Sequence, residues 1–226
     1  MDNYYLGAYW HGRKEKLDTI INKSILFLNK LSEIDKSFLH WYKEGYNCSE
    51  ANEIEINYAF LEKMYKSKLK NGDIDKNGYS KVGFRISGWS GHQDDFLNTS
   101  FSIAAGDDFI KIPNSCIVSI PHKGEEKKRL LEINIIKKIL KEMIIVWKPD
   151  YAVLQSQKLK DVVKAKNLIG WVTYYDKRFN LPKLPDAFSI EEVKGFGSII
   201  HINTTFDVNE QSLTNELLNL KSILGI

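Results

Sequence analysis

Apolar residues recur at helical spacing in five stretches of the chain. Over residues 13–32 they fall on one stripe at about 100° per residue, with lysines and acids on the other side. Asp35 is a favourable N-cap for a second, short helix that ends at Gly45. Together these patterns predict helices over residues 13–32, 35–45, 50–70, 126–147 and 209–224.

Other stretches alternate apolar with polar or small residues, which is the period of a half-buried strand. This alternation and an aromatic run near the N-terminus predict strands over residues 3–10, 81–89, 97–105, 115–120, 151–156, 169–175, 190–195 and 198–205. Strands that follow one another this closely are expected to pair antiparallel. The order of elements predicts an α+β fold in which about five helices cover a mainly antiparallel sheet of about seven or eight strands. We expect one domain over residues 1–226.

The composition is that of a globular protein. The 226 residues are 43% hydrophobic and 27% charged, which allows a large core without crosslinks. No apolar run approaches the ~20 residues that cross a bilayer. The N-terminus has no basic segment followed by an apolar one, so we expect no export signal and a cytoplasmic protein. Cys48 and Cys116 are then expected to be reduced.

The net charge of +3 comes from bases and acids that are interspersed along the chain. Proteins that bind nucleic acid usually concentrate basic residues on one face. Here Glu125 and Glu126 interrupt the basic run from Lys123 to Lys128. We therefore expect no direct contact with nucleic acid.

Several short motifs approach known sites and miss them. Residues 73–78 copy the first half of an EF-hand loop, but Lys81 and Phe84 stand where calcium ligands are required, so a polar turn is predicted. Pro149-Asp150 with a later lysine misses the nuclease metal pattern by one residue, which turns a strand side chain to the other face. Gly195-Phe196-Gly197 is predicted to be a hairpin turn because a strand and not a helix follows it.

Acidic pairs are the remaining candidates for metal or catalytic chemistry. Asp107 and Asp108 follow a predicted strand, and Asp94 and Asp95 lie in a loop at the opposite end of the same strands. The two pairs are therefore not expected to converge. We predict no catalytic residue, no metal ligand and no cofactor.

The five tryptophans divide into two groups. Trp10, Trp41, Trp147 and Trp171 lie on apolar stripes and are predicted to be core residues. Trp89 is different, because alternation turns it away from the predicted core residues Val82, Phe84 and Ile86. An exposed aromatic residue at this position would suit an anchor for a protein partner.

A set of short motifs, taken in order, resembles the immunity protein 52 family of bacterial polymorphic-toxin systems. The motifs extend over nearly the whole chain: Tyr4-Tyr5-Leu6-Gly7-Ala8-Tyr9-Trp10-x-x-Arg13, Leu28-x-x-Leu31 to Asp35, Trp41-Tyr42, Gly83-Phe84-Arg85 with Trp89, Gly106, Pro121, Trp147-x-Pro149-Asp150, Gly170-Trp171-x-Thr173-Tyr174 and Leu181-Pro182.

This resemblance implies a cytosolic protein that binds a cognate secreted toxin and neutralises it without catalysis. The family's toxins look mostly like DNases of the restriction-endonuclease fold, often delivered by type VI secretion. Acidic side chains that face the basic cleft of such a nuclease would speed its capture. The first candidate contact patch is Trp89 with Asp94 and Asp95, and the second is Asp107 with Asp108.

Two other classes of function stay open at this point. A metal-dependent hydrolase would use His92 with Asp94 and Asp95, or the Asp107 pair, and would need these groups to meet in one cleft. A small-ligand-binding protein would need a deep aromatic pocket.

Overall fold

The computed structural model describes residues 3–43, 51–108, 114–164, 169–203 and 210–225. It contains one sheet whose eight strands are β1 (Tyr4–Trp10), β2 (Phe84–Trp89), β3 (Ser100–Ala105), β4 (Asn114–Ser119), β5 (Tyr151–Ser156), β6 (Val172–Asp176), β7 (Phe188–Val193) and β8 (Gly197–Ile202). The α-helices are α1 (Leu17–Ile34), α2 (Tyr58–Lys66), α3 (Gly124–Leu130), α4 (Ile133–Trp147), α5 (Gln157–Val163) and α6 (Glu210–Leu224). The predicted α+β class is therefore confirmed.

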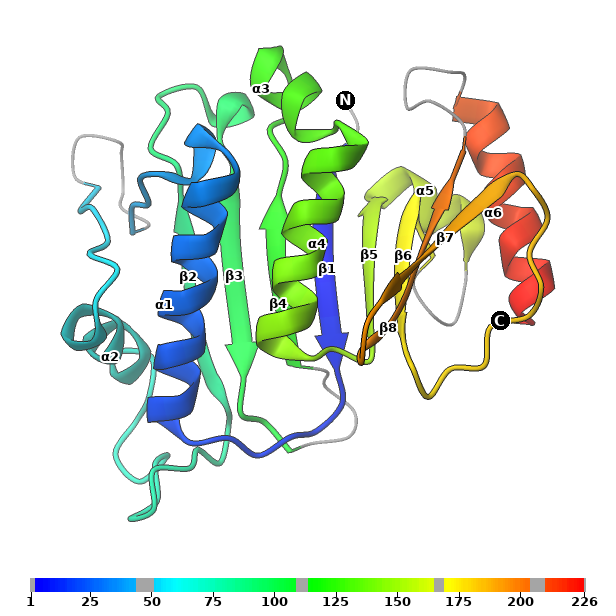
Figure 1. Ribbon diagram of the computed structural model, residues 1–226. Helices are drawn as coiled ribbons and strands as arrows, with labels where there is room; N and C mark the ends of the chain where they lie inside the picture. The colour runs from blue at the N-terminus through cyan, green and yellow to red at the C-terminus, as the bar shows by residue number, and fades with distance from the viewer. Residues whose placement is uncertain (1–2, 44–50, 109–113, 165–168, 204–209, 226) are drawn as a thin grey trace.

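The strand order is β2-β3-β4-β1-β5-β6-β8-β7, and every neighbouring pair is antiparallel. The first strand of the chain thus lies inside the sheet, between β4 and β5 (Figure 1). It has no charged residue, and Leu6, Ala8 and Trp10 are buried on one of its faces. The unbroken sheet favours a single domain, which stays a prediction.

Helices α1 and α4 pack side by side on one face of the sheet, in front of β2, β3, β4 and β1 in Figure 1. Helix α2 contacts α1 and β2, where Tyr65 meets Phe84 edge-on with ring centroids 6.3 Å apart. Helices α5 and α6 pack against each other at the other end of the sheet. Within the described ranges, no helix is both long and apolar enough to cross a membrane.

The core contains the four tryptophans predicted for it, since Trp10, Trp41, Trp147 and Trp171 are at most 5% exposed. Val82 was predicted to be a core residue of a strand, and this was wrong. Its side chain is 49% exposed because β2 begins only at Phe84. Cys116 is buried and free, whereas Cys48 lies outside the described residues.

Three predicted helices differ from the structure. The segment after Asp35 forms a 3-10 turn over Lys36–Phe38, and only Tyr58–Lys66 of the predicted 50–70 is α-helical. The predicted helix 126–147 is two helices, because the backbone at Glu132 is extended and ends the first before the second begins. Helix α5 was not predicted; the Ser156 hydroxyl starts it by accepting a hydrogen bond from the Leu159 N–H at 3.2 Å.

Candidate functional site

A cavity of about 700 Å³ lies at one end of the central strands, where β1 and β6 end and β5 begins. Its lining combines aromatic rings with charged side chains: Trp10, His11, Gly12, Arg13, Lys148, Asp150, Tyr151, Tyr175, Asp176, Arg178 and Phe179. These residues come from three separate parts of the chain, around residues 10–13, 148–151 and 175–179. The cavity therefore exists only because the antiparallel order of β1, β5 and β6 brings three strand ends together.

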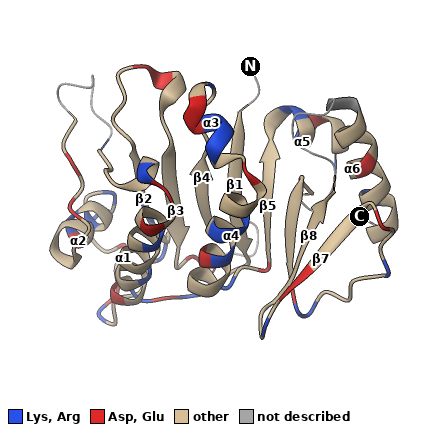
Figure 2. Ribbon diagram, turned by 45° about the horizontal axis from the view of Figure 1, so that its top comes forward, with Lys and Arg blue, Asp and Glu red and all other residues tan. Residues whose placement is uncertain are grey.

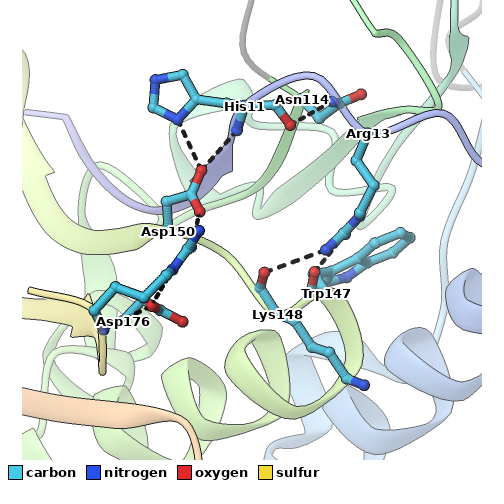
Figure 3. A network of polar contacts seen from close by, with 8 residues as sticks. His11, Arg13, Asn114, Trp147, Lys148, Asp150 and Asp176 are labelled. Carbon is cyan, nitrogen blue, oxygen red and sulfur yellow. Dashed lines mark hydrogen bonds and ion pairs between the residues drawn. The ribbon is translucent and has the colours of Figure 1, made fainter.

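Asp150 joins the three segments (Figure 3). Its Oδ2 accepts hydrogen bonds from the His11 backbone N–H and the His11 ring Nδ1, both at 2.8 Å. Its Oδ1 accepts a hydrogen bond from the guanidinium of Arg178, which also donates from Nε to Asp176 at 2.5 Å. The loop after β1, the start of β5 and the turn after β6 are thus held by one carboxylate.

These contacts also set the charge of Asp150. Burial alone would raise the pKa of this carboxyl, but the hydrogen bonds from His11 and Arg178 outweigh burial and hold the pKa below its usual value. An ionised carboxylate only accepts hydrogen bonds, so the His11 ring carries a proton on Nδ1. Asp150 is therefore an anionic anchor in the wall of the cavity.

Arg13 fixes the opposite wall. Its guanidinium donates to the carbonyl oxygens of Trp147 at 2.6 Å and Lys148 at 3.3 Å, at the C-terminal end of α4. Helix α4 has no basic residue in its own last turn, so Arg13 supplies the positive charge that a helix C-terminus favours. The guanidinium also lies 5.2 Å from the ring centroid of Trp10.

Aromatic rings form an apolar row across the strands beside the cavity. Tyr9 stacks on Tyr151 with ring centroids 5.2 Å apart, and Tyr151 is the cross-strand neighbour of Tyr175. Tyr175 in turn stacks on Phe179 at 4.4 Å. The hydroxyl of Tyr175 is buried and has no hydrogen-bond partner within the described part of the chain. The cavity thus has an apolar, aromatic side and a charged side.

The first predicted contact patch lies at the opposite end of the strands. Trp89 faces away from Phe84 and Ile86 as predicted, but it is half-buried, since its Nε1 donates to the Lys43 carbonyl at 3.1 Å and its ring contacts Tyr42. Asp94 forms an ion pair with Lys123, with Oδ2 and Nζ 2.7 Å apart, and it also caps the 3-10 turn Asp95–Leu97. Asp95 in this turn is exposed. Whether these residues contact a partner stays a prediction.

The second predicted patch borders the cavity loop. Asp107 is 9% exposed, and its carbonyl accepts hydrogen bonds from the Arg13 N–H at 3.0 Å and from Asn114 at 2.9 Å. Asp108 is exposed, and its backbone lies close against Gly12. The two acidic pairs therefore lie at opposite ends of the strands, as the sequence predicted, and do not form one site with His92.

The turn at residues 73–78, which resembles half of an EF-hand loop, is held by hydrogen bonds to its own backbone. Asp75 Oδ1 accepts hydrogen bonds from the N–H groups of Asn77 at 2.8 Å and Tyr79 at 3.0 Å, which is an Asx-type turn. Across the residues that the structure describes, no three His, Cys, Asp or Glu side chains are grouped so that they could hold a metal ion.

The sequence did not predict a site at the cavity residues. Asp150 appears in the rejected nuclease motif and in one motif of the family resemblance, and Arg178 appears in neither. A signal was nonetheless present, because Trp10-x-x-Arg13 and Trp147-x-Pro149-Asp150 are separate motifs of the family resemblance that meet at this cavity. Nothing in the sequence indicates that Arg178 would complete it.

The fold and the cavity together define an α+β protein with an aromatic and charged cavity at one end of its central strands. Comparison identifies its family: the family model described as immunity protein 52 matches residues 2–214, so the chain belongs to the immunity protein 52 family. The resemblance noted in the sequence is confirmed.

A solved structure shares the fold. The Pseudomonas aeruginosa T6SS protein PA0821 superposes with a TM-score of 0.55 at 11% identity, over 99% of this chain and 73% of that chain. No curated protein sequence matches the chain.

Proposed function

We propose that this chain is an immunity protein that binds a cognate toxin in a stoichiometric complex and neutralises it without turnover. The observation that carries this proposal is the family match, which extends over residues 2–214. The cavity chemistry supports it. A group that transfers protons works best with a pKa near the operating pH, whereas the pKa of Asp150 is lowered and both of its oxygens hold neighbouring loops.

We further propose that the toxin is a nuclease of the restriction-endonuclease fold, delivered by type VI secretion and neutralised in the cytoplasm. The family resemblance favours this toxin class, and the fold shared with a T6SS protein fits the same setting. In this proposal the chain contacts the toxin protein and not nucleic acid. Trp89, Asp94 and Asp95, together with Asp107 and Asp108, are proposed contact residues.

The test uses the cognate toxin, which the proposal places in a gene beside the gene for this chain. Co-expression should rescue the growth of cells that make the toxin, and purified chain added to the toxin should stop DNA cleavage at an endpoint of about one chain per toxin. An inhibitor of this kind needs nanomolar affinity, or about −12 kcal/mol. Protection at strongly substoichiometric amounts would instead indicate an enzyme that modifies the toxin.

The cavity supports a second candidate, a small-ligand-binding protein. Its volume of about 700 Å³ and its aromatic side match the size and lining of ligand pockets. A thermal-shift screen with small carboxylates and phosphates tests this candidate, and a stabilisation that Arg178→Met abolishes would support it.

A further inference from the structure

The face of the sheet opposite α1 and α4 has an unusual composition over β2, β3, β4, β1 and β5. The strand registers place three rows of five side chains on this face. We call these fifteen residues the serine–tyrosine face: Trp89, Ser100, Ser119, Tyr5 and Gln155; Ser87, Ser102, Ile117, Gly7 and Val153; Arg85, Ala104, Ser115, Tyr9 and Tyr151.

Only one of these fifteen residues, Arg85, is charged. The chain as a whole is 27% charged, so a face left to water would be expected to carry about four charged residues. Figure 2 shows that the charged residues gather on the helices and loops, and β1, β3, β4 and β5 contain none. Depletion of charge is the compositional mark of the centre of a protein–protein interface.

Helices cover the other side of these strands. Trp147 of α4 stacks on Trp10, and Tyr65 of α2 contacts Phe84, both on the side opposite the serine–tyrosine face. On the serine–tyrosine face itself, Arg85 and Ser102 are exposed and ten residues are half-buried, whereas Gly7, Val153 and Gln155 are buried. The face is therefore accessible on the central strands.

Serine and tyrosine supply different parts of a contact surface. Five serines offer hydroxyl groups that donate and accept, at a small cost in side-chain entropy. Tyr5, Tyr9 and Tyr151 supply large amphipathic rings, and Tyr9 lies over Gly7, where a Cβ would meet the Tyr9 hydroxyl oxygen at 2.4 Å and its ring at 2.7 Å. Rigid tyrosines among small polar residues are also the composition of antibody combining sites.

The size of the face indicates how much of an interface it can supply. Five strands spaced about 4.8 Å apart and three rows about 6.8 Å apart cover on the order of 400–500 Å². A standard interface uses about 800 Å² from each partner. The remainder would come from charged rims at the two ends of the strands, where Asp94 and Asp95 lie at one end and Arg178, Lys148 and Asp108 at the other.

We propose that the serine–tyrosine face is the centre of the surface that binds the toxin; this inference rests on the proposed function. Because the face has a single charged residue and has small side chains, including five serines, beside its aromatic rings, its partner surface presents projecting aromatic or amide side chains and few charges. Acidic and basic contacts are confined to the rims, where they guide the approach of the partner.

The test measures binding to a catalytically inactivated form of the toxin encoded beside this gene. Ser102→Arg places a long charged side chain at the middle of the face, and we expect it to raise the dissociation constant at least tenfold. Ser222→Arg, at an exposed serine of α6, is the matched control and should change the constant less than twofold, as should Ser102→Thr. Thermal unfolding shows whether each variant is folded.

A second measurement needs no substitution. Hydroxyl-radical footprinting of the complex should show protection of Tyr5, Tyr9 and Tyr151, while Tyr58 on α2, which is 39% exposed, stays as reactive as in the free protein.

If the unaltered chain does not bind the toxin, the proposed function fails and this inference fails with it. If the unaltered chain binds and Ser102→Arg binds equally well, with no protection of the tyrosines, only this inference is wrong. A chain dimer that Ser102→Arg dissociates, with toxin binding unchanged, would assign the face to a second copy and overturn the proposal.

Discussion

Trp10, the last residue of β1, stacks on Trp147, the last residue of α4, with ring centroids 5.5 Å apart and ring planes 15° apart. Phe27 of α1 meets Trp147 edge-on at 6.4 Å, so the stack also joins α1. Both tryptophans belong to motifs that end in cavity residues, Arg13 and Asp150. The stack therefore positions the two chain segments that form the cavity walls.

Trp147→Ala tests this packing. Removing a fully buried tryptophan leaves a void in the core, and we expect a loss of about 3–5 kcal/mol in the free energy of unfolding. Urea denaturation followed by circular dichroism measures the loss. Leu26→Ala on α1, where the leucine is 48% exposed, is the control and should stay within about 0.5 kcal/mol. A loss below about 1 kcal/mol for Trp147→Ala would mean that the stack does not organise the core.

Arg13→Met tests the contact between the β1 loop and the end of α4. The substitution keeps the apolar stem but removes the hydrogen bonds to the carbonyl oxygens of Trp147 and Lys148. We expect the free energy of unfolding to fall by about 1–2 kcal/mol. The fall should be smaller for Arg13→Lys, because a lysine keeps the charge but not the planar guanidinium.

The matched control for Arg13→Met is Lys148→Met, which removes an exposed charge at the same cavity and should have little effect on unfolding. Equal losses for the two variants would show that charge near the cavity, and not the cap on α4, determines the effect.

The fold could be predicted largely because its signals are local. Strand alternation placed β5 at residues 151–156, and the pairing of successive strands followed from their short connections. The break between α3 and α4 has no proline or glycine to mark it, so the apolar periodicity of 126–147 suggested one helix. Helix α5 is only seven residues long and is stabilised by packing on α6 and β5, which sequence periodicity does not report.

The candidate site depends on contacts between distant residues. His11 and Asp150 are 139 positions apart, and Arg178 reaches Asp150 from the turn after β6. Pairings of this kind follow from strand order, which placed β1 between β4 and β5. The family motifs contain Arg13 and Asp150 but neither His11 nor Arg178, and they give no geometry. The serine–tyrosine face likewise emerges only when the registers of five strands are known.

A double-mutant cycle tests the link between α3 and the end of α1. Arg129 donates to both carboxylate oxygens of Asp35, at 2.7 and 3.1 Å, and to Ser37 at 3.0 Å. Burial would raise the pKa of Asp35, but these hydrogen bonds outweigh it and the pKa is lowered. We expect Asp35→Asn and Arg129→Met to show a coupling energy of about 1–2 kcal/mol in urea unfolding.

The exposed pair Lys128–Glu125 on the same helix is the control for this cycle, and its coupling should be below about 0.5 kcal/mol. Additive effects of Asp35→Asn and Arg129→Met would contradict the bidentate contact.

Asp150→Asn tests the anchor of the cavity through its dependence on pH. The pKa of Asp150 is lowered in the folded chain, so the carboxylate contributes stability above the usual aspartate pKa of about 3.9, and this contribution is lost as the pH falls through the folded pKa. At pH 6–7 the free energy of unfolding of the unaltered chain should therefore exceed that of Asp150→Asn by on the order of 1–2 kcal/mol, because the substitution weakens the charged hydrogen bonds to His11 and Arg178. This difference should shrink below about pH 4. Urea unfolding at a series of pH values measures it, with the exposed Asp186→Asn as the control. A difference that stayed constant down to pH 3 would show that the substitution acts through packing and not through the charge of Asp150.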